Sequence, residues 1–166
     1  DKVPPVPLNN KQLLCKDIVH DYVRKWTLAK HEGATWPKPL RLFLMEPPGT
    51  GKSTNTKHMM ATLIDILGAN WTDYVKQATP TGCASFQMSS SATTIHQLLG
   101  LSLNPSRDLK PKEVKSLEEK FRHGLCLLVL DEVSMVPRSL MGIVLHRLKQ
   151  AHLDFNHLGI IMIGDP

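Results

Sequence analysis

The sequence predicts an α/β domain in which helices cover both faces of a parallel β-sheet. Three short runs of aliphatic residues are typical of strands buried on both faces, and longer segments with helical spacing of apolar residues alternate with them. Strands and helices that alternate in this way imply right-handed crossovers and a three-layer architecture. The length of 166 residues suits a single domain with its own core.

The first 39 residues are expected to form an N-terminal helix and a linker, and residues 40–166 to form the main domain. The helix is expected from about Lys11 to Leu28, because apolar side chains recur there on one face. The segment 31–39 contains a glycine and two prolines, which predicts a loop that leads into the first strand.

The main domain is expected to alternate between strands and helices. Strands are expected at residues 40–45, 125–130 and 159–163, with a weaker fourth candidate at 74–79. Apolar residues at spacings of three and four predict helices between Gly51 and Gly68, around residues 114–121 and around residues 140–148.

The composition is that of a globular protein and excludes a fibrous or disordered chain. The net charge of +5 leans towards a polyanionic partner, but the basic residues of segment 110–122 alternate with acids, so a solvated amphipathic helix explains them better than a nucleic-acid patch. No apolar run approaches the roughly 18 residues of a membrane span, and the proline-rich start is unlike a targeting peptide. The three dispersed cysteines predict free thiols in a reducing compartment.

A strand, a glycine-rich turn and a helix follow one another in the segment that contains Glu46-Pro-Pro-Gly-Thr-Gly-Lys-Ser53. Glycines in the turn let backbone N–H groups converge on phosphate oxygens, and the new helix directs its free N–H groups at the same anion. Lys52 can reach the β- and γ-phosphates of ATP, and the Ser53 hydroxyl can ligate Mg²⁺. This context disfavours an ordinary strand-to-helix turn. The predicted nucleotide-binding residues are Gly49, Thr50, Gly51, Lys52, Ser53 and Thr54.

Glu46 stands where phosphate loops usually begin with glycine. If its carboxylate points inward it repels triphosphate, and a Cβ is costly if the position requires positive φ. If the side chain instead points to solvent from the strand end, it has little effect. The first alternative predicts that Glu46→Gly tightens nucleotide binding.

Asp131 and Glu132 directly follow the aliphatic strand 125–130. Such an acidic pair after a buried strand is the usual partner of a phosphate loop in nucleoside triphosphatases. Asp131 is expected to hold Mg²⁺, and Glu132 to act as general base on the attacking water. Lys52, Asp131 and Glu132 are therefore the predicted catalytic residues, with Ser53 and Asp131 as the metal ligands.

Four further segments occur in the order found in PIF-like DNA helicases of superfamily one. They are Ala78-Thr-Pro-Thr-Gly-Cys-Ala84, Thr94-Ile-His96, Asp131-Glu-Val-Ser-Met135 and Gly164-Asp-Pro166. From Leu8 to Pro166 the chain resembles the first RecA-like motor domain of that family, which includes the helicases of Helitron-type transposons. The resemblance implies a RecA-like phosphate-loop fold, hydrolysis of ATP, and movement 5′→3′ along single-stranded DNA.

The resemblance also assigns residues outside the phosphate loop. Segment 8–12 resembles the Q motif, which implies that Gln12 reads adenine, as the donor and acceptor of an amide allow. Without the resemblance, Gln12 would pass for a glutamine on a helix surface. Thr81 and the backbone of Gly82 would contact phosphates of single-stranded DNA, and Thr94 and His96 would line the same path. For His96, a buried and hydrogen-bonded histidine is an equal alternative.

The family motif continues as Gly-Asp-Pro-x-Gln, whereas this sequence ends at Pro166. The resemblance implies a glutamine that senses the γ-phosphate and a second RecA-like domain with arginines, neither of which is in these residues. The 166 residues are therefore expected to hold ATP but not to unwind DNA alone. The resemblance further implies DNA repair or recombination, and the DNA substrate implies the nucleus.

Two other functions remain open. The segment Pro47-Pro-Gly-Thr-Gly-Lys52 is also common in AAA+ ATPases, which usually carry a polar sensor, often asparagine, at the end of the strand after the acidic pair. The ending Gly164-Asp165-Pro166 favours the helicase. The third possibility is a transposon-derived remnant that binds nucleotide or DNA poorly and hydrolyses nothing, suggested by Glu46 and by the end at Pro166.

Overall fold

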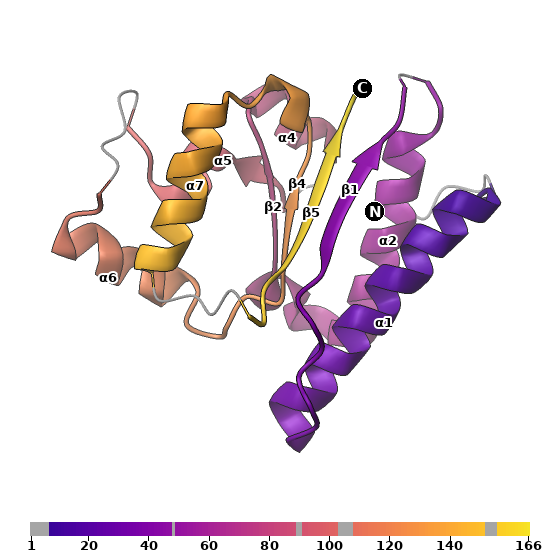
Figure 1. Ribbon diagram of the computed structural model, residues 1–166, viewed down its shortest axis with the longest axis horizontal. Helices are drawn as coiled ribbons and strands as arrows, with labels where there is room; N and C mark the ends of the chain where they lie inside the picture. Colours follow the sequence, from indigo (N-terminus) through magenta and orange to yellow (C-terminus); the bar gives the residue numbers. More distant parts are fainter. Residues whose placement is uncertain (1–6, 48, 89–90, 103–107, 152–155) are drawn as a thin grey trace.

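The computed structural model describes residues 7–47, 49–88, 91–102, 108–151 and 156–166. One sheet of five parallel strands has the order β1-β5-β4-β2-β3. The strands are β1 (Arg41–Met45), β2 (Val75–Thr79), β3 (Thr93–Thr94), β4 (Leu127–Leu130) and β5 (Gly159–Gly164). Their carboxyl ends lie at the same end of the molecule as the C-terminus (Figure 1).

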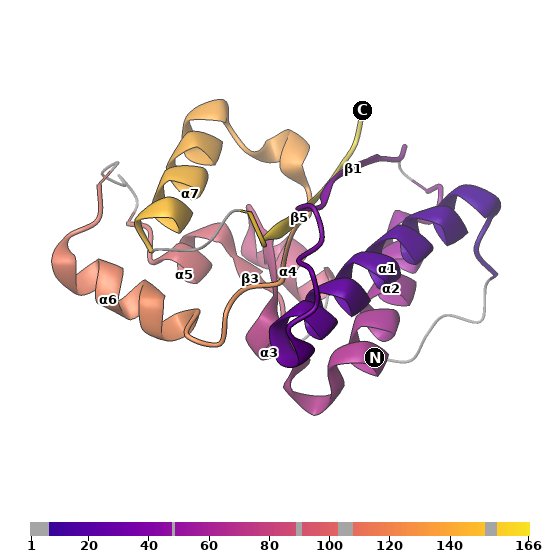
Figure 2. The same cartoon turned by 60° about the horizontal axis from the view of Figure 1, so that its bottom comes forward.

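Helices cover both faces of this sheet. They are α1 (Asn10–Glu32), α2 (Lys52–Leu67), α3 (Trp71–Tyr74), α4 (Gly82–Met88), α5 (Ile95–Leu99), α6 (Pro111–Lys120) and α7 (Arg138–Gln150), with short 3₁₀ turns η1 (Gly68–Asn70) and η2 (Val133–Met135). Helices α1 and α2 lie side by side on one side of the sheet, and α5, α6 and α7 lie on the other (Figures 1 and 2). The predicted α/β architecture is confirmed.

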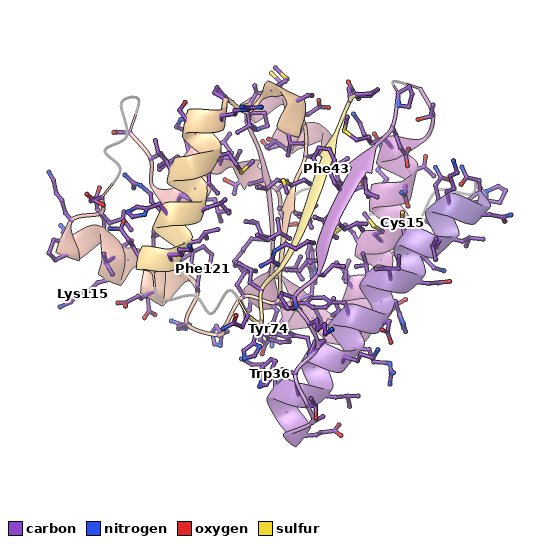
Figure 3. All side chains as sticks on the ribbon, in the orientation of Figure 1. Cys15, Trp36, Phe43, Tyr74, Lys115 and Phe121 are labelled. Atoms are coloured by element: carbon purple, nitrogen blue, oxygen red, sulfur yellow. The ribbon has the colours of Figure 1, made fainter. Side chains whose placement is uncertain are left out.

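Strand β4 shows how the sheet divides the core into two layers. Leu127 and Val129 pack towards α1 and α2, whereas Leu128 and Leu130 pack towards α5, α6 and α7. This alternation follows from the two-residue period of a strand. Strand β1 lies at the edge of the sheet, and its Phe43 is 53% exposed (Figure 3).

Helix α1 is joined to the sheet at the end opposite the strand carboxyl ends. It starts with a capping box between Asn9 and Gln12 and packs Val19 and Val23 into the core. The Tyr22 hydroxyl and the Trp26 indole N–H both donate to the carbonyl of His157, each at 2.9 Å. These two bonds fix α1 relative to the segment that enters β5.

The predicted strands are confirmed, including the weaker candidate at 74–79. The N-terminal helix extends four residues beyond its predicted end, to Glu32, because Gly33 supplies the left-handed cap there. Segment 110–122 contains α6, a solvated helix with Leu117 buried and Lys115 exposed (Figure 3). Residues 1–6 of the predicted N-terminal segment, and Pro48 of the predicted loop, lie outside the described residues.

The short elements η1, α3, α4, β3, α5 and η2 were not predicted. Each has seven residues or fewer, so neither a strand alternation nor a helical period can build up over it. Within the described ranges, the helices are too short or too polar to cross a membrane.

Candidate active site

The loop between β1 and α2 turns back so that its backbone faces the start of α2. Gly49 and Gly51 adopt left-handed conformations with φ of 81° and 100°, which residues with a Cβ rarely adopt. Thr50 donates its N–H and its hydroxyl to the carbonyl of Pro47, at 3.3 and 2.7 Å. The Asn55 N–H bonds the Gly51 carbonyl at 2.9 Å, so the earlier N–H groups of α2 remain available to an anion.

The order of the strands decides which residues meet this loop. Strand β5 lies between β1 and β4, and all three are parallel, so their carboxyl ends share one edge. The loop follows β1, the acidic pair Asp131 and Glu132 follows β4, and Asp165 follows β5. The loop and the acidic pair therefore lie close together because β1 and β4 are parallel and only β5 separates them in the sheet.

Lys52 opens α2 and lies among carboxylates. Its Nζ is 2.5 Å from Asp165 Oδ1 and 3.8 Å from Glu132 Oε1, and its side chain is only 17% exposed. Burial alone would lower the pKa of Lys52, but the bond to Asp165 and the charge of Glu132 raise it above its usual value. Lys52 is therefore a fixed cation at the mouth of the loop.

The acidic pair has a strained backbone. Glu132 has φ 55°, the only positive φ of a non-glycine residue in the described ranges, and its N–H donates to Asp131 Oδ1 at 2.8 Å. The αL conformation turns the chain sharply into η2 and leaves the Glu132 carboxylate facing Lys52. Burial, and in smaller part the charge of Glu132, raise the pKa of Asp131.

A pocket lies between the start of α2, the start of α4 and the end of β4. It is lined by Lys52, Ser53, Thr56, Lys57, Ala84, Asp131 and Glu132. The pocket is lined by the carboxylates of Asp131 and Glu132 and by the ammonium groups of Lys52 and Lys57, so its lining charges balance. A hydroxyl and carboxylate oxygens are donors that Mg²⁺ prefers, so Ser53 and Asp131 fit the metal predicted for them.

Gln12 is buried, which excludes a glutamine on the helix surface. Its Oε1 accepts the N–H of Asn9 at 3.0 Å, while its Nε2 lies 3.1 Å from the point that a Cβ on Gly51 would occupy. The capping box therefore uses the acceptor of Gln12 and directs its donor at the phosphate loop. Thr54, also predicted at this site, is half-buried in the first turn of α2.

Glu46 takes neither of the two orientations considered from the sequence alone. The residue is half-buried, so its carboxylate does not point into solvent, and its φ is not positive. Its Oε1 accepts from Asn55 Nδ2 at 3.4 Å, and its negative charge contributes to raising the pKa of the Cys15 thiol, after burial. The side chain therefore faces α1 and α2, and the backbone cost of a Cβ does not arise.

The four predicted DNA-contacting residues lie at the carboxyl ends of two adjacent strands, β2 and β3, where Thr79 pairs with Thr94. Thr81 and Gly82 are exposed at the start of α4. The Thr94 hydroxyl accepts the N–H of Gln97 at 3.1 Å, which makes it the cap of α5. His96 is half-buried, so it is not the fully buried histidine of the alternative interpretation.

Four residues at the site were not predicted, among them Ala84 of α4, which lines the pocket. Thr56 and Lys57 line the pocket one turn after Ser53, and the 3.6-residue period of α2 could have indicated them. Asp165 bonds Lys52, and its place after a strand was visible in the sequence. The sequence does not indicate the strand order that brings Asp165 next to Lys52.

A protein-family model described as "AAA domain" matches residues 36–166, which is most of the chain. The chain belongs to the AAA domain family. The match contains the phosphate loop, the acidic pair and Asp165, and it begins after α1. No curated protein sequence matches this AAA domain.

Solved structures share its fold. The Pif1 helicase from Candida albicans is 20% identical over 96% of this chain and 33% of its own, with a TM-score of 0.64. Pif1 helicase from Bacteroides, in complex with ADP-AlF3 and single-stranded DNA, is 21% identical over 96% of this chain and 32% of its own, with a TM-score of 0.61. The AAA domain therefore spans about a third of these helicases, and the predicted RecA-like fold is confirmed.

A more distant likeness is to PCH-2 from C. elegans, which is 16% identical over 97% of this chain and 39% of its own, with a TM-score of 0.51. At this identity the likeness concerns the fold alone. It is weaker than the likeness to the Pif1 helicases, whose TM-scores reach 0.64.

Proposed function

We propose that this AAA domain is the ATP-binding and ATP-hydrolysing motor domain of a DNA helicase that moves 5′→3′ along single-stranded DNA. The observation that carries the proposal is the convergence of Lys52, Asp131 and Glu132 beside a glycine-rich loop, on a sheet with the Pif1 fold. A Pif1 helicase solved with ADP-AlF3 and single-stranded DNA supports both the nucleotide and the DNA.

The residues of the loop would bind the triphosphate. Backbone N–H groups from Gly49 to Ser53 surround the phosphates, and Lys52 places its ammonium on the β- and γ-phosphates. Ser53 and Asp131 would hold Mg²⁺, which neutralises phosphate charge when bound. Because the Asp131 and Glu132 carboxylates repel the phosphates when no metal is bound, we expect Mg²⁺ to tighten nucleotide binding.

Glu132 is placed to act as the general base. Its carboxylate takes the proton of a water molecule that attacks the γ-phosphorus, and the bond from that phosphorus to the bridging oxygen breaks to release ADP. Glu132 Oε1 lies 3.8 Å from Lys52 Nζ, so the proposed general base is next to the ammonium group that would bind the γ-phosphate.

The DNA would lie across the ends of β2 and β3. Thr81 and Gly82 are exposed there and can bond backbone phosphates, while Ala84 of the same helix lines the nucleotide pocket. Helix α4 therefore connects the two sites. Thr94 and His96 would extend the path along α5. Gln12 would read the adenine.

The remaining parts of the proposal come from the family resemblance. A second RecA-like domain would close over the nucleotide and the DNA, and unwinding would require both domains. DNA repair or recombination in the nucleus is the proposed setting.

The test is the ATPase rate of the protein with and without oligothymidylate, together with calorimetric binding of Mg·ADP. We expect DNA to stimulate hydrolysis, and Lys52→Ala to abolish binding while Lys115→Ala, an equal charge change at an exposed position of α6, leaves it unchanged. An ATPase rate indifferent to DNA would support an AAA+ ATPase instead. Nucleotide binding without hydrolysis under either condition would support the inactive remnant.

The DNA path is tested separately by fluorescence anisotropy with labelled oligothymidylate. Thr81→Ala should weaken DNA binding about threefold to tenfold, the usual effect of one lost phosphate contact, and leave Mg·ADP binding unchanged. Thr35→Ala, in the exposed loop before β1, is the control and should bind as the wild type does. Equal DNA binding by all three proteins would exclude α4 from the DNA path.

A further inference from the structure

Asp165 is held in place by packing around the end of β5. Gly164 pairs with Met45, and its carbonyl accepts the N–H of Glu46 at 3.3 Å. A Cβ at Gly164 would lie 3.0 Å from a methyl of Val133, so the absence of a side chain lets η2 pack closely against this strand. The next residue, Asp165, is therefore fixed between the phosphate loop and the acidic pair.

Asp165 is the nearest partner of the Lys52 ammonium. Its Oδ1 lies 2.5 Å from Lys52 Nζ, whereas the Glu132 carboxylate is 3.8 Å away. Lys52 is 17% exposed, so water can solvate only part of its charge. The bond to Asp165 compensates the Lys52 ammonium group for the hydration that it loses by burial.

A bound triphosphate needs the same ammonium. The β- and γ-phosphate oxygens and the Asp165 carboxylate are all anions that accept from Lys52 Nζ, and they repel one another at such short range. We propose that Asp165 is a positioning residue that holds Lys52 while nucleotide is absent and competes with the phosphates for its ammonium. This proposal rests on the proposed nucleotide site. Its consequence is that nucleotide binding separates the Asp165 carboxylate from Lys52.

The experiment compares wild type, Asp165→Asn, Asp165→Ala and Asp65→Asn by calorimetry with Mg·ADP. Asp165→Asn keeps the shape but removes the charge, and the exposed Asp65 lies near the far end of α2, so Asp65→Asn is the control for net charge. We expect both Asp165 variants to bind Mg·ADP about two- to fivefold more tightly than wild type, as expected for loss of a partly exposed competing ion pair, and Asp65→Asn to match wild type.

A second measurement does not depend on nucleotide. Acetic anhydride labels the neutral amine, so Lys52 without its carboxylate partner should be acetylated faster in nucleotide-free Asp165→Asn than in wild type, with Lys16 as the internal reference. Mass spectrometry gives the rate at each lysine. If Asp165 has only a structural role, the acetylation rate of Lys52 relative to the reference lysine should be the same in Asp165→Asn as in the wild type.

Unchanged or weaker Mg·ADP binding by both Asp165 variants would overturn the competition, and weaker binding would place Asp165 among the nucleotide or metal ligands. If Lys52→Ala abolishes binding in the same series, the nucleotide site stands while the role of Asp165 falls. If Lys52→Ala binds as the wild type does, the nucleotide site and the role of Asp165 fall together. Should Asp165→Asn fail to fold by circular dichroism, Asp165→Ala decides.

Discussion

The side-chain amide nitrogen of Gln12 lies 3.1 Å from the point that a Cβ on Gly51 would occupy. Helix α1 therefore contacts the phosphate loop at a glycine, and Gly51 is needed for its left-handed φ of 100° as well as for the room that it leaves. The start of α1 and the loop form one unit, although the linker and β1 separate them in sequence.

Gly51→Ala should weaken Mg·ADP binding by at least about tenfold, because a new Cβ strains the loop and moves Gln12. Calorimetry measures the affinity. Gly68→Ala is the matched control, since Gly68 also has positive φ, 71°, but lies at the other end of α2. Both variants should lose thermal stability, but only Gly51→Ala should bind Mg·ADP more weakly. Equal affinities would show that the loop does not need this conformation.

Glu132→Gln should bind Mg·ADP as the wild type does but hydrolyse ATP at least about 100-fold more slowly, because an amide cannot accept the proton of the attacking water. Single-turnover hydrolysis with radiolabelled ATP measures the chemical step. Glu119→Gln, on the exposed end of α6, is the control. Hydrolysis at the wild-type rate would assign the base to another residue.

Asp131→Asn should raise the thermal midpoint in metal-free buffer at pH 7 by about 1–4 °C. The raised pKa of Asp131 means that the folded protein holds this proton more tightly than the unfolded chain, so stability falls as pH rises through the folded pKa. An asparagine at position 131 carries no charge at pH 7, so this loss of stability does not occur, and its Oδ1 can still accept the Glu132 N–H. The difference should vanish near pH 3, where both states of wild type are protonated. A lower midpoint at pH 7 would contradict the sign.

Glu46→Gln should raise the free energy of unfolding by about 0.5–1.5 kcal/mol, measured by urea denaturation. Within the described residues, Glu46 Oε2 and Asn55 Oδ1 are both buried acceptors without a donor. The side-chain amide of the new glutamine supplies an N–H donor at this place, and its oxygen can still accept from Asn55 Nδ2. Glu32→Gln, at the exposed end of α1, is the control and should be neutral. Loss of stability would mean that the carboxylate itself is required.

Lys52, Asp131 and Glu132 could be placed at one edge of the sheet from the sequence, because their segments follow strands and the carboxyl ends of parallel strands share an edge. The contact between Asp165 and Lys52 depends on the order itself, with β5 between β1 and β4, and no periodicity in the sequence encodes that.

Burial of polar side chains was the other aspect beyond the sequence. Gln12 and Glu46 are residue types usually found at the surface, yet Gln12 is buried beside the loop and Glu46 is half-buried and bonded to Asn55 of α2. Their environment is set by the packing of α1 on α2, which involves residues far apart in the chain. The α4–β3–α5 segment was missed for a different reason, since a two-residue strand carries no measurable alternation.

The pairing of β1 with β5 also constrains how the chain can fold. Arg41 lies in register with Ile160, whose N–H donates to the Leu40 carbonyl at 2.8 Å, and β5 is the only neighbour of β1 among the described strands. During synthesis the strand that precedes the phosphate loop leaves the ribosome early, but its partner is made only after β2, β3 and β4. This long-range closure slows folding and leaves the apolar side chains of β1 uncovered in the meantime. Of the five strands in this sheet, the first to be synthesised is therefore among the last to find its partner, and a chaperone that shields it would act before residue 160 emerges.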